Sequence, residues 1–322
     1  MTDQQPKLEQ EPPPWGAAEP ERRLRPNPRT RWPSNADAIT AGLAYLLSQR
    51  RNRRWGHLDL PWGAADAGVT ARVLACVGEP PPHLVSPSLQ RAVEESLDWL
   101  QRARTPDGGW GYPGADDADS TAWAVIALRK NGRAAPVPAL QFIRRCHRPD
   151  GGFAGCPQGG ASTPETTALA VQALGTLDPA AAGAAADFLS SCLQSDGARL
   201  AFPLCVCAGI LEWEKVLAPL ALLNQVCQMT ACFRAESASE QALLLRCFGR
   251  LRLNRAWSLA AGLRAKQLDD GSWPGPSGAQ LNFDDKRIIP TATAVSALVL
   301  GEFQPGLYFG SDLPRPRRLH ES

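Results

Sequence analysis

The sequence predicts an all-α fold in which helical hairpins repeat along the chain and close into two concentric rings. Three observations lead to this prediction. A loop rich in Gly, Asp and aromatic residues recurs, helical segments follow each copy of it, and these segments alternate between amphipathic and apolar. With 322 residues, 44% of them hydrophobic and 20% charged, the chain is long enough to bury one large core.

The recurring loop carries an aromatic residue in four copies. They are QRRNRRWG (49–56), RTPDGGWG (104–111), HRPDGGFAG (147–155) and QLDDGSWPG (267–275), and a fainter copy is QSDG (194–197). The Asp-Gly steps at 107, 150, 196 and 270 are separated by 43, 46 and 74 residues, so the last interval is close to two short periods. Asp-Gly favours a tight turn with positive φ, and the aromatic that follows is expected to pack against the next repeat.

The segments between the loops have helical spacing. Residues 88–104 place Leu89, Val93, Leu97 and Leu100 on one stripe with charges opposite, which indicates an amphipathic surface helix. Residues 120–128, 166–174 and 291–300 are apolar on nearly all sides, which indicates buried helices. Each period therefore predicts an outer helix, a loop and an inner helix, and six periods make twelve helices.

Composition limits the class of protein. The Pro- and Arg-rich residues 1–34 and 304–322 are expected to be disordered tails flanking one domain over 35–303. A net charge of +2 provides no field for general nucleic-acid binding, so no nucleic-acid partner is expected. Because no secretory signal and no apolar run of membrane-spanning length is present, we expect a cytoplasmic protein, with peripheral contact to a membrane as an alternative.

One loop contains a complete family motif. Gln267, Gly271 and Trp273 form Q-xxx-G-x-W, which resembles the QW repeat of squalene-hopene cyclases, class II terpene cyclases and protein prenyltransferase β subunits. The resemblance covers about residues 35–303 and implies a single α/α toroid of six helical hairpins, with inner and outer rings. The other loops depart from the motif, since Arg104 and His147 occupy Gln positions and the first loop lacks its Gly.

A second resemblance concerns chemistry. The segment DADST (117–121) resembles the DxDD motif of class II cyclases, whose middle acid protonates an alkene or epoxide. The resemblance implies that Asp119 is the general acid and that Asp117 sets its proton affinity, with Ser120 in place of the last Asp. An isolated Asp, with a pKa of about 3.9, is ionised at neutral pH, so crowding and burial of the carboxyls must raise proton affinity. The alternative is that Ser120 or Asp119 caps the helix without any chemistry.

Further residues are candidates for contact with the substrate. Aromatic faces stabilise carbocations, which makes Trp123, Trp62 and Phe283 candidates beside Ser120. Aligning DAGVTARVL, DADSTAWAV and TPETTALAV adds Asp66 and Glu165 at the rim of the ring. Ordinary packing of the aromatics and helix capping by the acids are the alternatives. Arginines 50, 51, 53 and 54 are either a diphosphate site or a solvated charged loop.

These residues predict a class II terpene-cyclase-like enzyme, of the isomerase or lyase type, acting on a polyprenyl chain or a prenylated small molecule. Neither a cofactor nor a metal is expected, except Mg²⁺ if the substrate carries a diphosphate. One alternative is a non-catalytic toroid that binds a lipid or a protein. The other is an enzyme like the prenyltransferase β subunit, which needs zinc, although no histidine lies in that family's late ligand context.

Chain length predicts an open face. Class II cyclases usually enclose their cavity between this toroid and a second helical domain, whereas this sequence has length for one ring. We therefore expect a homodimer, a partner subunit or a peripheral membrane contact to cover the open face. The apolar segment 216–223 and the Arg-rich N-terminal tail are the expected docking elements, and an inner helix is the alternative for 216–223.

Overall fold

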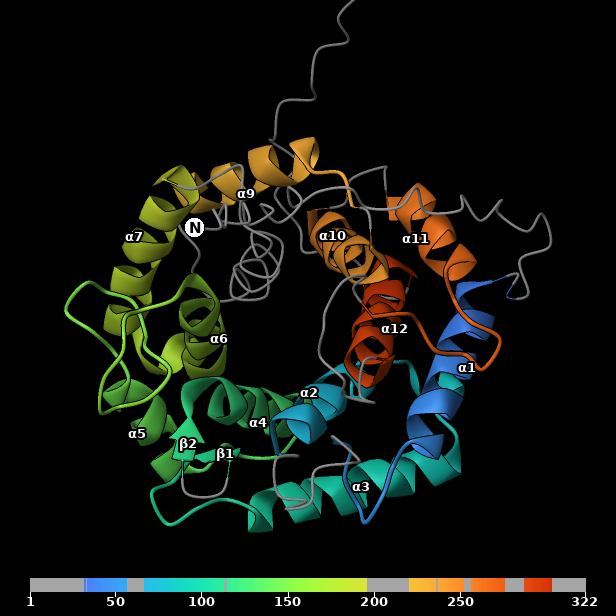
Figure 1. Cartoon of the computed structure of the whole chain (residues 1–322), viewed down its shortest axis with the longest axis horizontal. Helices are drawn as coiled ribbons and strands as arrows, with labels where there is room; N and C mark the ends of the chain where they lie inside the picture. Colours follow the sequence, from blue (N-terminus) through green and yellow to red (C-terminus); the bar gives the residue numbers. More distant parts are fainter. Residues whose placement is uncertain are drawn as a thin grey trace, which may run out of the picture.

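The computed structural model describes residues 32, 34–56, 67–112, 115–195, 220–235, 237–251, 256–275 and 287–302. Figure 1 shows the odd-numbered helices as an outer ring and the even-numbered helices as an inner ring. The outer helices are α1 (Asn35–Ser48), α3 (Pro87–Arg102), α5 (Val137–Arg145), α7 (Pro179–Ser195), α9 (Leu220–Cys232) and α11 (Ala256–Ala265). The inner helices are α2 (Ala67–Val77), α4 (Ala118–Lys130), α6 (Pro164–Leu174), α10 (Ala238–Leu251) and α12 (Ile288–Glu302).

The prediction of a mainly helical chain is confirmed, and the two rings alternate in the order that the hydrophobic pattern indicates. The expected segments 88–104, 120–128, 166–174 and 291–300 correspond to α3, α4, α6 and α12. The six-hairpin toroid stays a prediction, because the remaining inner helix would fall within 196–219, outside the described residues. Most of the predicted tails, 1–34 and 304–322, also lies outside them. The apolar segment 216–223 is described from Leu220 onward, where α9 begins in the outer ring (Figure 1).

Burial follows the two kinds of helix. In α12 every residue from 290 to 300 is buried, as expected for a helix that packs on all sides. In α3 the buried side chains include Leu89, Val93, Leu97 and Leu100, which is the stripe that the sequence predicts. The inner helices therefore form most of one continuous apolar core, which the outer helices cover. No helix of the described residues combines the length and apolar character needed to cross a membrane.

A repeated polar contact joins each loop to the inner helix that follows it and, where the aromatic is Trp, also to the preceding outer helix. The loop aromatics are fully buried, and the backbone N–H of each one donates to the hydroxyl of a buried Thr on the following inner helix. These pairs are Trp55 with Thr70 (2.9 Å), Trp110 with Thr121 (3.0 Å), Phe153 with Thr167 (2.9 Å) and Trp273 with Thr291 (3.0 Å). Each indole N–H also donates to a carbonyl near the end of the preceding outer helix: Leu46 (2.6 Å), Leu100 (2.8 Å) and Leu263 (2.7 Å). We call this arrangement the aromatic–threonine clamp.

The loop glycines let each loop approach the next outer helix. Gly108, Gly151 and Gly271 have φ values of 97°, 87° and 85°. A Cβ at Gly271 would lie 2.5 Å from the carbonyl oxygen of Ala41 in α1, and Gly108 and Gly151 meet carbonyls of α5 and α7 in the same way. In the first loop, which lacks the Gly, Asn52 and Arg53 adopt the positive φ values of 48° and 67°.

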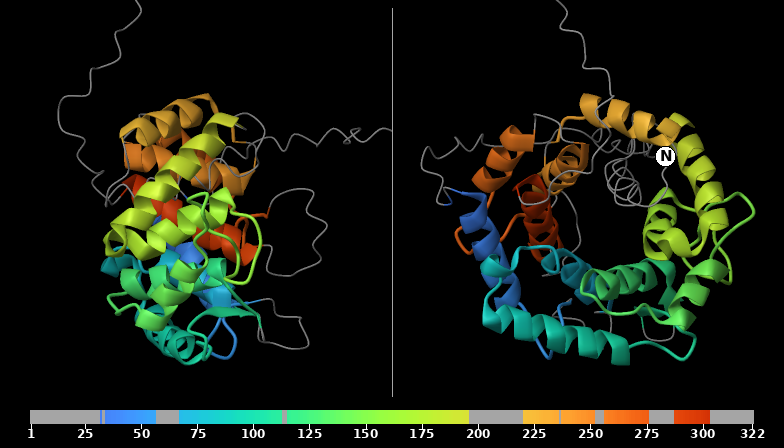
Figure 2. Two further views of the ribbon diagram at one scale, coloured as in Figure 1. Left: turned by 90° about the vertical axis from the view of Figure 1, so that its left-hand side faces the viewer. Right: turned by 180° about the vertical axis from the view of Figure 1, so that it is seen from behind.

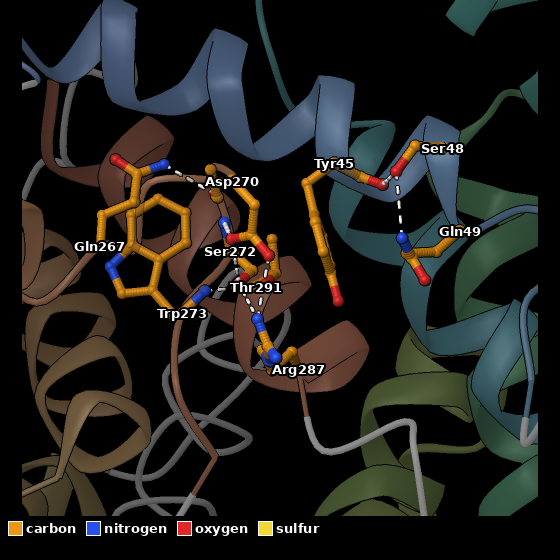
Figure 3. Close-up of polar contacts among 10 residues, drawn as sticks. Tyr45, Ser48, Gln49, Gln267, Asp270, Ser272, Trp273, Arg287 and Thr291 are labelled. Atoms are coloured by element: carbon orange, nitrogen blue, oxygen red, sulfur yellow. Dashed lines mark hydrogen bonds and ion pairs between the residues drawn. The ribbon is translucent and has the colours of Figure 1, made fainter.

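The ring closes where the last loop meets the first helix. The side-chain amide of Gln267 donates to the carbonyls of Gly271 (2.8 Å) and Ala38 in α1 (2.9 Å). Figure 3 shows this seam, with Tyr45 of α1 projecting toward Arg287 and Arg287 paired with Asp270 at 2.9 Å. The right-hand view of Figure 2, from behind, shows that α1 completes the outer ring beside α11. The two ends of the domain therefore hold each other in place.

Two features were not predicted. Before α4 the chain forms a small antiparallel sheet of β1 (Trp110–Tyr112) and β2 (Ala115–Asp117), with Trp110 opposite Asp117. Short 3-10 turns, Pro82–Leu84 and Gly175–Leu177, lie in the connections at the other end of the inner helices. Periodicity over such short segments carries no signal, so the sequence indicated only a loop at 110–117.

Replacing Gly271 by Ala is expected to destabilise the ring. The left-handed backbone costs a residue with a Cβ about 1–2 kcal/mol, and the contact with Ala41 adds to this cost. Gly183→Ala is the matched control, because Gly183 lies in α7 with open space around its Cα and Ala is the better helix former. Urea unfolding should show a loss for the first variant and a gain of about 0.5–1 kcal/mol for the second. Equal shifts in the two variants would contradict the role given to the seam.

Candidate active site

The acidic segment lies where β2 passes directly into α4. Asp117 is the N-cap of α4, with extended backbone angles of φ −125° and ψ 154°. Its Oδ1 accepts a hydrogen bond from the backbone N–H of Ser120 at 2.6 Å. The cap is therefore Asp117, and the sequence-based alternative that Ser120 or Asp119 caps this helix is wrong, because the helix begins earlier than its apolar pattern indicates.

The aromatic–threonine clamp fixes the position of this segment. The Thr121 hydroxyl accepts from Trp110 N–H at 3.0 Å and lies 2.7 Å from the carbonyl oxygen of Asp117, to which it donates. Ala118, the residue after Asp117, donates its N–H to the carbonyl of Gly155 in the neighbouring loop at 2.8 Å. The backbone around Asp117 is thus held from two repeats at once.

The three aspartates of the segment have different surroundings. Asp116 accepts a hydrogen bond from the Thr105 hydroxyl, which holds it in its own loop. Asp117 is half-buried and engaged with the helix terminus, whereas Asp119, in the first turn, is exposed. The carboxyl groups of Asp116 and Asp117 therefore have structural partners, and Asp119 is the most accessible of the three.

Burial raises the pKa of the Asp117 carboxyl above its ordinary value. The carboxylates of Asp119 and Asp116 act in the same direction, while hydrogen bonds from Ser120 oppose the shift. Among these effects burial is the largest. The first turn of α4 therefore carries a carboxyl group that takes up a proton more readily than an ordinary Asp.

The partly exposed side chains of α4 mark the face that points toward the middle of the ring. Asp119 and Trp123 are four residues apart and so share one face. The other faces of α4 pack against α2 and α6 on either side and against α5 in the outer ring. Ser120 lies at the α2 side, where a Cβ at Gly68 would be 2.7 Å from its hydroxyl oxygen. Trp123 has the guanidinium of Arg72 over its ring, 5.2 Å from the centroid.

The remaining predicted residues fall into two groups. Thr163 caps α6 as Asp117 caps α4, and Glu165 follows two residues later, so it occupies the level of Asp119 in the next inner helix. Trp62, Asp66 and Phe283 lie outside the described residues, so their predicted contact with the substrate stays a prediction. Arg72 was not predicted from the sequence, and the structure places its guanidinium beside Trp123 on the face of α4 that points toward the middle of the ring.

Two arginines of the first loop contact the outer helix α3. Arg50 pairs with Glu95 of α3 at 2.8 Å and bonds to the Ser96 hydroxyl at 2.9 Å. The guanidinium of Arg54 stacks on Trp99 of the same helix, 5.6 Å from the ring centroid. These contacts hold two of the four arginines against the outer ring, which favours a structural role over the diphosphate site. Within the described ranges, no group of three or more His, Cys, Asp or Glu side chains is placed to hold a metal ion.

Two curated proteins resemble part of the chain. Drimenyl diphosphate synthase from Streptantibioticus cattleyicolor is 35% identical over 150 residues, which is 44% of this chain and 26% of that protein. Drimenyl diphosphate synthase from Streptomyces showdoensis is 32% identical over 139 residues, 41% of this chain and 26% of that protein. The matched segments thus span about a quarter of these relatives. No protein-family model matches the chain.

Solved structures resemble the fold over most of its length. A variant of the type II terpene cyclase MstE from Scytonema has a TM-score of 0.68 at 20% identity, covering 83% of this chain and 96% of that one. A further structure of this cyclase, with geranylgeranyl dihydroxybenzoate as substrate, has a TM-score of 0.60 at 19% identity and covers 83% and 97% of the two chains. The ent-copalyl diphosphate synthase from Streptomyces platensis has a TM-score of 0.53 at 22% identity and covers 73% and 50%. The chain therefore has the fold of type II terpene cyclases.

The Asp117 carboxyl predicts a specific dependence of stability on pH. Because its pKa is raised in the folded chain, ionisation of Asp117 favours the unfolded state, so the wild type should lose stability relative to Asp117→Asn as pH rises from about 4 to 7. Asn caps a helix as well as Asp does, so the cap is retained. Urea midpoints of both proteins across this range test the prediction. A difference that stays constant with pH would contradict it.

The clamp at Thr121 predicts a loss of stability in Thr121→Val. Removing the hydroxyl leaves the buried N–H of Trp110 without its acceptor, which costs about 1–3 kcal/mol. Thr293→Val is the matched control, because the Thr293 hydroxyl bonds only to the carbonyl of Ile289 in its own helix, which already serves the helix ladder. Denaturant unfolding should show a large loss for the first variant and a change below about 0.5 kcal/mol for the second.

Proposed function

We propose that this chain catalyses a protonation-initiated cyclisation of a polyprenyl or prenylated substrate, with Asp119 as the general acid. The observation that carries the proposal is the position of Asp119. It lies in the first turn of an apolar inner helix, next to a carboxyl group whose pKa is raised by burial, and on the face shared with Trp123. The similarity to drimenyl diphosphate synthases and the fold of type II terpene cyclases support the same reaction class.

The proposed reaction begins with proton transfer from the Asp119 carboxyl to the terminal alkene. The π electrons form the new C–H bond, a tertiary carbocation remains, and the next alkene closes a ring by donating its own π electrons. The final cation loses a proton to water, and Asp119 regains a proton from water, so substrate and product are isomers and the enzyme returns to its starting state. In this proposal Asp117 assists the acid, because the pKa of its own carboxyl group is raised by burial and by the neighbouring carboxylates.

The substrate class follows from the relatives. Their names include a diphosphate product and a geranylgeranyl dihydroxybenzoate substrate, so we propose a prenyl chain that carries a polar or charged head group. Protonation of an alkene requires no metal, and we assign none to Asp119. Mg²⁺ is expected only with a diphosphate substrate, whose charge it would balance.

Length alone does not require a second domain. Because MstE matches over 96% of its chain and 83% of this one, a type II terpene cyclase exists at about the size of this single ring. A second copy, a partner subunit or a membrane surface over the open face therefore stays a proposal, and light scattering with liposome co-sedimentation tests it. A monomer that ignores liposomes and still cyclises substrate would contradict it.

A non-catalytic ring that binds a lipid remains the second candidate, because Ser120 occupies the place of the last acid in the DxDD motif that the segment resembles. The two candidates differ in one outcome. A catalyst releases cyclised product, whereas a binding protein returns the prenyl compound unchanged.

Asp119→Asn is expected to abolish cyclisation, a loss of at least about 100-fold, because Asn has no proton to donate. Folding should be unchanged, since Asp119 is exposed and does not cap the helix. Products from prenyl diphosphates, squalene, oxidosqualene and prenylated benzoates should be compared by mass spectrometry. Asp107→Asn, a change of the same kind at an exposed loop position, is the control. Equal turnover in the wild type and Asp119→Asn would remove Asp119 as the acid.

A further inference from the structure

Arg72 is a half-buried cation on an apolar inner helix. Its Nε is buried without a hydrogen-bond partner, and no ion pair among the described residues involves it. Its recorded contact is with the ring of Trp123 at 5.2 Å. A guanidinium that is partly removed from water without a carboxylate loses hydration that one aromatic face does not replace. The position therefore suits an anion that binds from outside the protein.

A second group of charged side chains lies toward the other end of α4. Lys130, at the end of α4, pairs with Glu79, whose side chain is 5% exposed, and Glu79 also accepts from the Ser296 hydroxyl of α12. From the other side, Arg246 of α10 donates to Ser296 at 2.7 Å. Since Glu79 already has two donors, it does not neutralise Arg72.

This cluster joins neighbouring helices of the inner ring. Ser296 is in the middle of α12, and it is reached from α10 on one side and from the end of α2 on the other. Since α1 and α11 cover the outward face of α12 (Figure 1), these contacts run between neighbours of the inner ring. Arg72 and Cys76 are four residues apart and share one face of α2, and Glu79 lies two residues after that helix ends.

The thiol of Cys76 reports how close these charges are. Burial raises its pKa, and Arg246, Glu79, Lys130 and Arg72 are the charged groups that act on it. Three of these charged groups come from α10, α4 and α2, and the fourth is Glu79, just after the end of α2. Three of the four are cations, so their net positive charge attracts an anion.

We propose that Arg72 binds the anionic head group of the substrate, a phosphate or a carboxylate attached to the prenyl chain. The assignment rests on the proposed function only in naming that chain. Arg72 lies at the level of Trp123, which is four residues from Asp119 along α4. At 1.5 Å per residue this level is about 6 Å from the level of the acid along the helix axis. The head group would therefore bind deeper in the ring than the alkene that Asp119 protonates.

The test measures binding in the full-length Asp119→Asn protein, which cannot turn over its ligand. Isothermal titration with geranylgeranyl diphosphate, geranylgeranyl dihydroxybenzoate and geranylgeraniol compares two anionic head groups with a neutral one. Adding Arg72→Gln is expected to lower the affinity for the diphosphate or the dihydroxybenzoate by at least about tenfold. The affinity for geranylgeraniol should change less than twofold. The anionic ligand that loses affinity identifies the head group. Arg91→Gln, the same change at an exposed position of α3, is the control and should alter none of them.

A uniform loss for all three ligands, or no loss, would overturn the assignment. Competition in protein that keeps Arg72 is independent of how the variant folds: inorganic diphosphate should displace geranylgeranyl diphosphate and leave geranylgeraniol bound, and failure to displace it rejects a phosphate site. If Arg72→Gln weakens only the anionic ligand but the wild type yields no cyclised product, the head-group site stands and the proposed function fails. If the wild type yields cyclised product and Arg72→Gln weakens no ligand selectively, the proposed function stands and the head-group site fails.

Discussion

The structure depends on one repeated contact, the aromatic–threonine clamp. A loop that passes from the outer ring into the core must bury its backbone N–H groups, and each buried N–H needs an acceptor. In the described loops that acceptor is a Thr hydroxyl near the start of the inner helix, at positions 70, 121, 167 and 291. An apolar residue there would leave the aromatic's N–H unsatisfied, and a larger polar residue would not fit among fully buried neighbours. The clamp thus reconciles an apolar inner helix with a loop that enters it.

The clamp also explains why the acid lies where it does. It fixes the first turn of each inner helix relative to the preceding outer helix, so the residue before that turn is held in a reproducible place. At α4 this residue is Asp117, and at α6 it is Thr163, and both serve as N-caps. A carboxyl placed two residues later, such as Asp119 or Glu165, then projects at the same level in neighbouring helices. The arrangement of polar side chains at this rim is a consequence of the repeat, with one copy carrying the acidic pair.

Sequence patterns predicted the repeat, the alternation of amphipathic and apolar helices and the burial of the loop aromatics, because these follow from periodicity and from residue size. They did not resolve whether the cap was Asp117, Asp119 or Ser120, since the helix begins at Ala118, before its apolar run becomes continuous. They also missed Arg72. Its signal was present, because a single Arg interrupts an otherwise apolar inner helix, in the alignment position that Trp123 occupies in the next one. Pairing between helices far apart in sequence, as between Glu79 and Ser296, leaves no local trace.

The balance of forces at Asp117 limits how the acidic segment can vary. The helix terminus and the Ser120 N–H favour the ionised carboxyl, while burial and the neighbouring carboxylates favour the protonated one, and burial is the largest effect. A second acid at position 120 would add repulsion and increase proton affinity further. That position faces Gly68 of α2, where the Ser120 hydroxyl already leaves no space for a Cβ. A carboxylate at 120 would have to displace α2 or turn toward the middle of the ring. The small residues at 68 and 120 therefore form a matched pair: they let α2 and α4 pack closely, and this close packing brings Arg72 over Trp123.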